Sequence, residues 1–243
     1  MRTLSANDVK ALGAEHFASA SYVVIDTETT GRDPAKHFVW SFAAVVLSRG
    51  PTYRLDLEEH TALFDPPGGL PVELCRKFGW NPAVVAGCPS AADPGSFAAV
   101  ADLLEAKQPN PHYLVGHNVG FDVRFLEASG VSFDAFSASI DTLSLARSVS
   151  APRAPNTLTD ACARYRIDLD ANAAHGALVD ARACALLLPC LLRHVLTGKA
   201  PLAPTCPKCS QRHEVVVCAT TTVWKCESSQ SQTADPTFRA QEK

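Results

Sequence analysis

The sequence predicts an α/β fold in which helices flank a mixed β-sheet. Three observations lead to this class. β-branched and aromatic residues concentrate in segments before residue 65, while helical apolar periodicity dominates after residue 95. With 243 residues, 47% of them hydrophobic, the chain is also long enough to bury a full core. We therefore expect one main domain and a small appendage.

The first elements form an antiparallel meander. Residues 5–19 are predicted to be an amphipathic helix, and residues 21–26 a strand that ends in a TTG turn. Strands at 38–47 and 53–64 follow, separated by an Arg-Gly-Pro turn signal. Proline and glycine then recur from 66 to 94, which predicts surface loops around one short helix at 72–78.

Helices dominate the rest of the domain. Apolar spacing predicts a helix at 96–106, a strand at 112–116, and helices at 118–128, 142–149, 157–165 and 176–195. Pro189 should kink or split the last helix. The proposed organisation is a domain at 1–197, a proline-edged linker at 198–204, a cysteine-rich segment at 205–227 and a disordered tail at 228–243.

Composition excludes several classes of protein. The net charge of −3 argues against a broad basic face for nucleic acid, so any phosphate contact must be local. The sequence contains no apolar run of about 18 residues, and the amino terminus lacks a signal-peptide core. We therefore expect an intracellular, cytoplasmic protein without membrane contact. Nine cysteines without paired spacing argue against a disulfide framework.

Two acids follow the first strand in "VVIDTETTG". Positions two apart on a strand share a face, so Asp26 and Glu28 should project together at or just past the strand end. Like charges this close raise each other's proton affinity unless a cation lies between them, and carboxylates suit magnesium or manganese. The D-x-E pattern alone is also common on an exposed strand end where both acids are solvated.

Two later segments carry further acids. In "LVGHNVGFDVRFLEASG", Asn118 is a candidate helix cap and Asp122 lies one turn further among core-type aromatic residues; the alternative for Asp122 is a local salt bridge. In "AHGALVDARACALLL", Asp180 begins an apolar-striped helix. His175 precedes it by five residues, so His175 is expected on the loop that enters the helix, folded back over the same site.

Together these three segments, in this order and at these separations, resemble the three exonuclease motifs of the DEDDh family. That family includes the proofreading epsilon subunit of DNA polymerase III and ribonuclease T. The resemblance covers roughly residues 20–196 and implies a ribonuclease-H-like fold. One departure is Ser41, which stands where many members carry a glutamate that is not a metal ligand.

The resemblance also implies roles for individual residues. Asp26, Glu28, Asp122 and Asp180 match the four metal-binding acids, which would hold two Mg²⁺ or Mn²⁺ ions, and His175 matches the general base. Residues expected to hold the terminal nucleotide are Thr29, Thr30, Gly31, Asn118 and Phe121. For Thr29 and the turn after it, and for Phe121, ordinary turn and core packing is the alternative interpretation.

The predicted function is therefore metal-dependent 3′→5′ hydrolysis of nucleic acid to nucleoside 5′-monophosphates, with DNA favoured over RNA. Expected partners are single-stranded or frayed 3′ ends and a polymerase or a repair or replication protein. The alternatives are an RNA-trimming exoribonuclease and a non-catalytic nucleic-acid-binding or polymerase-binding module that keeps the fold.

The cysteine-rich segment has the spacing of a metal knuckle. Its C-P-x-C motif, a β-prone stretch and two more cysteines resemble a zinc ribbon with one structural Zn²⁺, held by Cys206, Cys209, Cys218 and Cys226. The spacing is irregular, because the second C-x-x-C is incomplete, and His213 is an alternative fourth ligand. A degenerate ribbon or loose thiols in a disordered tail is the competing interpretation.

Overall fold

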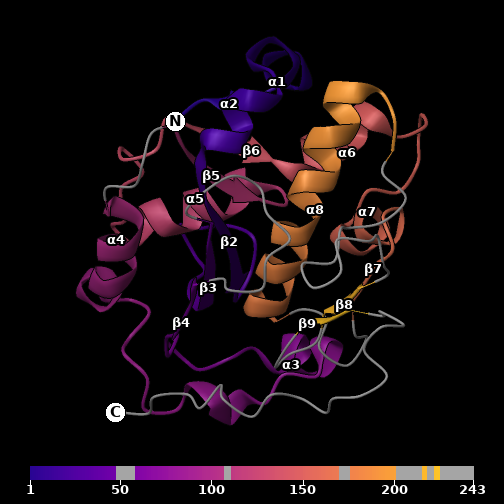
Figure 1. The fold of residues 1–243 in the computed structure, drawn as a ribbon. Helices are drawn as coiled ribbons and strands as arrows, with labels where there is room; N and C mark the ends of the chain where they lie inside the picture. The colour runs from indigo at the N-terminus through magenta and orange to yellow at the C-terminus, as the bar shows by residue number, and fades with distance from the viewer. Residues whose placement is uncertain (48–57, 107–110, 170–175, 201–214, 218–221, 225–243) are drawn as a thin grey trace, which may run out of the picture.

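The computed structural model describes residues 1–47, 58–106, 111–169, 176–200, 215–217 and 222–224. It confirms the predicted mixed sheet flanked by helices (Figure 1). Six strands lie in the order β1-β6-β5-β2-β3-β4. Their bounds are β1 Thr3–Leu4, β2 Ser21–Thr29, β3 Val39–Leu47, β4 Glu58–Leu63, β5 His112–Gly116 and β6 Ala138–Asp141.

Strand direction divides the sheet in two. β2, β3 and β4 pair antiparallel, which confirms the predicted meander. On the other side of β2, the strands β5, β6 and β1 pair in parallel. β2 is thus the central strand where the two halves meet, and it is buried along most of its length.

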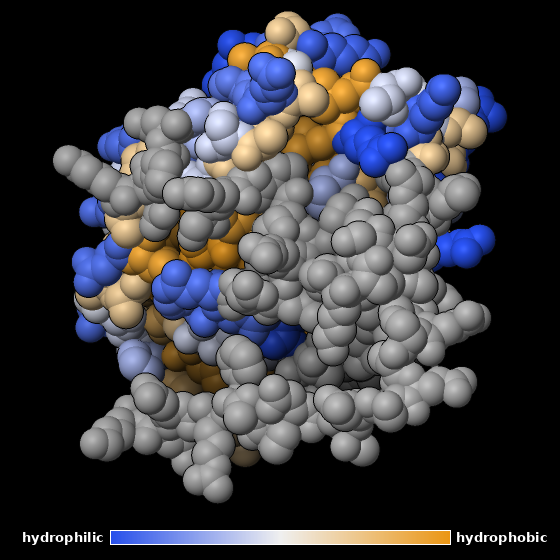
Figure 2. All heavy atoms as spheres, viewed as in Figure 1, coloured by the Kyte–Doolittle hydropathy of each residue, from blue (hydrophilic) through white to orange (hydrophobic). Residues whose placement is uncertain are grey.

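The helices cover both faces of the sheet (Figure 1). α8 (Ala177–Thr197) packs on the face that also receives α1 (Ala6–Leu12), α2 (Ala14–Ser19), α6 (Thr142–Val149) and α7 (Leu158–Ala163). α4 (Ala98–Glu105) and α5 (Val119–Ala128) cover the opposite face, and α3 (Val72–Phe78) belongs to a third, smaller cluster. The 3₁₀ turns are η1 (Pro82–Val85) and η2 (Pro94–Phe97). In Figure 2, apolar residues are visible between α1 and α8, where these two helices pack.

Several predicted elements have different bounds in the structure. The helix expected at 5–19 is two helices, because Gly13 has a φ of 80° and interrupts the α conformation. The strand expected to end at residue 26 continues to Thr29. The described part of the strand expected at 53–64 starts at Glu58, since residues 53–57 lie outside the described chain.

The longest helix does not split at its proline. α8 continues through Pro189 to Thr197, and most of its residues are buried. Pro189 removes one backbone hydrogen bond, a loss that would interrupt an exposed helix. Packing of α8 on several sides stabilises the helix despite this loss. Within the described residues, no helix is long and apolar enough to cross a membrane.

A second, small sheet joins the cysteine-rich segment to the main domain. It has the order β7-β8-β9, with β7 Ile167–Leu169, β8 Val215–Val217 and β9 Thr222–Trp224. β8 pairs in parallel with β7, and Val217 lies in the same core as α8. The four candidate zinc cysteines and the predicted disordered tail lie outside the described residues.

Candidate active site

The end of β2 presents two acids on one face. Tyr22 and Val24 point into the core beneath α8, and the alternation of the strand directs Asp26 and Glu28 to the same side. Asp26 pairs with Ala43 and Glu28 with Ser41 on β3. Both acids therefore lie within the last part of a rigid central strand rather than on the turn beyond it.

A third acid comes from the first turn of α8. Gly176 caps this helix, and Asp180 donates its backbone N–H to the Gly176 carbonyl at 3.1 Å. Carboxylate oxygens of Asp26, Glu28 and Asp180 all lie within 4.8 Å of one another. The helix thus brings an acid from about 150 residues further along the chain to the end of β2.

Asp122 reaches the same strand from the opposite face. It lies on α5 and is only 4% exposed. Its Oδ1 accepts hydrogen bonds from the Thr27 backbone N–H at 2.9 Å and from the Thr27 hydroxyl at 2.7 Å. Thr27 lies between Asp26 and Glu28, so Asp122 is anchored to the segment that carries the other two acids. It is not part of the group of three oxygens within 4.8 Å.

Burial raises the pKa of all four acids, and repulsion from the neighbouring acids adds to this for Asp26 and Glu28. Burial, followed by the charges of Asp122, Asp180 and Glu28, raises the pKa of Asp26 well above its usual range. Burial and the other acids raise the pKa of Glu28 to about 9. Burial raises the pKa of Asp122 to about 7, against the lowering effect of the Thr27 hydrogen bonds, and that of Asp180 to about 6.

This donor set fits a divalent cation. The cluster consists of carboxylate oxygens, which are the ligands preferred by hard ions such as Mg²⁺ and Mn²⁺. A bound cation would also offset the burial and repulsion that raise the pKa values of these acids. Asp26, Glu28 and Asp180 could therefore hold a metal ion, with Asp122 beside them.

The predicted nucleotide contacts at the end of β2 and in the turn after it have well-defined structural partners. The Thr29 hydroxyl donates to the Gly31 carbonyl at 2.6 Å, and the Thr30 hydroxyl accepts from the Phe38 backbone N–H at 3.0 Å. A Cβ on Gly31 would approach the His37 ring to 2.5 Å. These contacts fix the turn, as the alternative interpretation expected.

The remaining two predicted contacts lie at the start of α5. Asn118 occupies the cap position, but its side chain makes no capping hydrogen bond; its φ is 72°, and its backbone N–H donates to Asp141 Oδ1 at 2.8 Å. Phe121 is partly exposed, and its ring centroid lies 4.9 Å from that of Phe125. Asn118 therefore holds the predicted cap position, but its side chain accepts no hydrogen bond from the first turn of α5.

His175, the predicted general base, lies outside the described residues. It directly precedes Gly176, the cap of the helix that carries Asp180. Other residues at the site were not found from the sequence. Thr27 received no predicted role, although a hydroxyl at that position is the kind of donor that a buried carboxylate needs.

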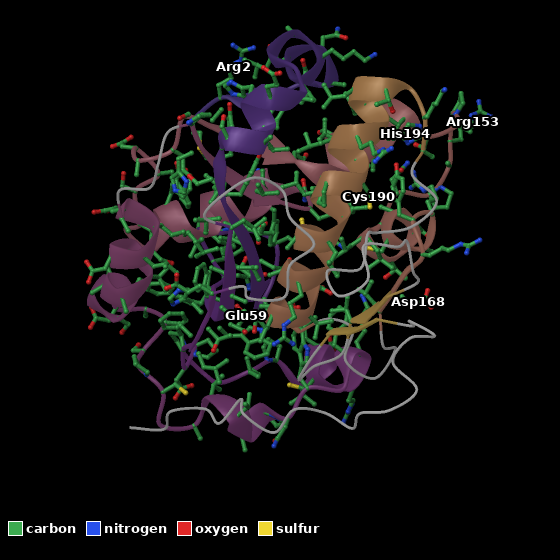
Figure 3. The ribbon with its side chains drawn as sticks, in the orientation of Figure 1. Arg2, Glu59, Arg153, Asp168, Cys190 and His194 are labelled. Carbon is green, nitrogen blue, oxygen red and sulfur yellow. The ribbon has the colours of Figure 1, made fainter. Side chains whose placement is uncertain are left out.

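Arg182 is a second residue that the sequence did not identify as important for the site. It is 8% exposed and makes two 2.6 Å hydrogen bonds to the Glu59 carboxylate, through Nε and one terminal nitrogen. Figure 3 shows Glu59 beside the lower end of α8, the end from which Asp180 projects. This ion pair ties the edge strand β4 to the helix that supplies Asp180.

The central mixed sheet, the covering helices and the acids at the end of β2 define a ribonuclease-H-like nuclease fold. Comparison with known proteins identifies the family. The family model described as Exonuclease (RNase_T) matches residues 23–188. The chain therefore belongs to this exonuclease family, of the DEDDh 3′→5′ type.

Individual relatives agree with this assignment. The chain is 31% identical over 176 residues to the PolC-type DNA polymerase III of Lacticaseibacillus paracasei, covering 71% of this chain and 11% of that relative. It is 28% identical over 174 residues to the epsilon subunit of DNA polymerase III of Rickettsia typhi, covering 68% and 71%. Escherichia coli exonuclease I in complex with single-stranded DNA superposes with a TM-score of 0.58 at 17% identity, covering 74% of this chain and 42% of that one. This last likeness concerns the fold.

Proposed function

We propose that this chain is a metal-dependent exonuclease that hydrolyses nucleic acid from the 3′ end to nucleoside 5′-monophosphates, with DNA preferred over RNA. The observation that carries the proposal is the group of Asp26, Glu28 and Asp180 oxygens within 4.8 Å, beside the anchored Asp122. Half-buried acids this close together carry an electrostatic cost, and acids with strongly raised pKa values cluster at functional sites.

Each residue of the site has a separate role in metal binding or proton transfer. Asp26, Glu28, Asp122 and Asp180 would hold two Mg²⁺ or Mn²⁺ ions. When bound, these ions would polarise the phosphodiester and lower the proton affinity of the attacking water. His175 would accept the proton of the attacking water, because a neutral imidazole can act as a base. The two hydrogen bonds from Thr27 favour the ionised form of Asp122, which metal binding requires.

The substrate preference rests on the relatives. Exonuclease I has been solved in complex with single-stranded DNA, and the Rickettsia relative is a subunit of DNA polymerase III. Single-stranded or frayed 3′ ends of DNA are therefore the proposed substrate, with a polymerase or another replication or repair protein as the proposed partner.

The test uses the full chain with Mg²⁺ or Mn²⁺ and 3′-labelled single strands of DNA and RNA of the same sequence. We expect mononucleotide release, faster from DNA, that falls at least a hundredfold in Asp122→Asn. The matched control is Glu127→Gln, which removes an exposed acid from the same helix and should leave the rate unchanged. Absence of release by the unmodified chain, or equal rates for both variants, contradicts the proposal.

The proposal of one structural zinc concerns Cys206, Cys209, Cys218 and Cys226, whose spacing is its support. Metal analysis of the purified full chain should give one zinc per chain. A zinc content near zero would contradict it.

A further inference from the structure

A pocket of about 440 Å³ lies beside the acid cluster, between the sheet and the first turn of α8. Its walls include Trp40, Leu63, Trp80, Val84 and the α8 residues Ala177 and Leu178. None of the described residues that line it has a charged side chain. The pocket therefore suits an uncharged, flat group better than a phosphate.

A β-bulge creates one wall of this pocket. Glu28 pairs with Ser41, but Thr29 pairs with Val39, so Trp40 is an extra residue in β3. Val39 and Phe42 both point into the core on the α5 face, whereas Trp40 packs with Leu63 on the α8 face. Bulges of this kind redirect a side chain near functional sites. Here the bulge moves an indole to the face that carries the acids.

The pocket adjoins the acids through two elements. Ser41, which lines the pocket, is the direct strand partner of Glu28. The other wall is formed by residues 176–179 of α8, which directly precede Asp180. A strand whose phosphate lies at the acids would therefore have a base within reach of the pocket.

The side chains in the pocket are suited to a base. The rings of Trp40 and Trp80 meet edge to face, with centroids 4.7 Å apart and an interplanar angle of 63°. Aromatic faces stack on any nucleobase without sequence preference. In addition, the Trp40 indole nitrogen is buried and has no hydrogen-bond partner among the described residues. A buried donor of this kind calls for an explanation. A ring nitrogen or carbonyl of a base would supply the acceptor once the surrounding side chains shift.

We propose that this pocket is a base-binding subsite, which receives one nucleobase of the strand next to the cleaved phosphodiester. The subsite is separate from the contacts predicted at Thr29, Thr30, Gly31 and Phe121. It rests on the proposed function, because a nucleic-acid strand must lie at the acids for a base to reach the pocket.

The test is equilibrium binding, measured by fluorescence anisotropy in Ca²⁺ with a dye-labelled DNA strand. Matched strands lack the base at the first, second or third nucleotide from the 3′ end. We expect the unmodified chain to bind one of these abasic strands roughly tenfold more weakly than the complete strand. In Trp80→Ala that difference should disappear, whereas Trp80→Phe, which keeps an aromatic face, should retain most of it.

Trp40→Phe provides a second readout, because it removes only the indole donor and keeps a ring. We expect the metal-free protein to unfold at the same or a higher temperature, since a buried unpaired donor is lost, while DNA binding weakens a few fold. A Trp80→Ala variant that weakens binding to all strands equally, including every abasic strand, would overturn the subsite, as would unchanged DNA binding by Trp40→Phe.

The binding assay separates this proposal from the catalytic one. If the chain releases mononucleotides but binds all abasic strands as well as the complete strand, the subsite is wrong and the exonuclease proposal stands. If base-dependent binding requires Trp80 but no release occurs, the pocket binds a base but the exonuclease proposal fails, and with it the placement of the pocket next to a cleaved phosphodiester.

Discussion

Thr27→Val should weaken metal binding in a way that depends on pH. The hydroxyl of Thr27 donates to Asp122 Oδ1 at 2.7 Å, and the backbone N–H of the same residue donates at 2.9 Å. Valine has nearly the same shape as threonine but cannot donate. The substitution therefore removes one of two hydrogen bonds to a buried carboxylate while the backbone bond remains.

The size of the effect follows from the pKa of Asp122, which is about 7. Loss of one hydrogen bond costs about 1 to 1.5 kcal/mol, which raises this pKa by about one. A metal needs the ionised carboxylate. At pH 7 the ionised fraction should fall from about half to about a tenth, which weakens metal binding roughly fivefold. At pH 9 both proteins are mostly ionised, so the loss should be less than about 1.5-fold.

The assay is calorimetric titration of the full chain with Mn²⁺ at pH 7 and pH 9. Thr197→Val is the matched control, because it makes the same chemical change at the far end of α8, where the hydroxyl donates to a backbone carbonyl at 2.8 Å. The control should bind as the unmodified chain does at both pH values. An equal loss of affinity at pH 7 and pH 9 in Thr27→Val, or no loss at either, would refute the electrostatic reasoning.

Three further predictions concern stability. The folded pKa of Glu28, about 9, lies above its usual value of 4.5, so the folded metal-free protein binds more protons than the unfolded chain and should lose stability as pH rises from about 5 to 9. Glu28→Gln should remove part of this loss, which urea denaturation in the presence of a chelator measures as a gain in the free energy of unfolding. The gain should be on the order of 1 to 3 kcal/mol at pH 8 and small at pH 5. Equal gains at both pH values would contradict this prediction. Arg182→Met should lower the free energy of unfolding by about 2 kcal/mol, because it leaves the Glu59 carboxylate without this partner. Adding Glu59→Leu should recover part of that stability. A double variant no more stable than Arg182→Met would count against the ion pair. Gly31→Ala should lower the free energy of unfolding by about 1 to 3 kcal/mol, because its Cβ would meet the His37 ring, and adding His37→Ala should restore the stability. A Gly31→Ala variant that melts at the same temperature as the unmodified chain would refute the contact.

Local patterns predicted several elements to the residue. The helix at 72–78, the strand at 112–116 and the helix at 142–149 have the expected bounds, because each combines a clear apolar pattern with a turn or capping signal. The alternation of β2 also predicted that Asp26 and Glu28 share a face. Chemistry that depends on neighbouring positions can therefore be predicted from sequence.

Features that depend on distant partners were missed. β6 has four residues and β1 has two, and each becomes a strand only by pairing with the parallel half of the sheet. The bulge at Trp40 is visible only in the register between β2 and β3. The bonds from Thr27 to Asp122 span 95 positions, and the ion pair of Arg182 with Glu59 spans 123. No local pattern carries this information.

The most direct test of the account is the rate of mononucleotide release from a 3′-labelled DNA strand as Mg²⁺ is titrated into the metal-free chain. We predict no release without metal, a saturable rise with Mg²⁺, and a loss of that rise in Asp26→Asn, which removes a central acid of the cluster. Release that persists in the chelator, or that rises equally in Asp26→Asn, would contradict the claim that the acids at the end of β2 act through a bound metal.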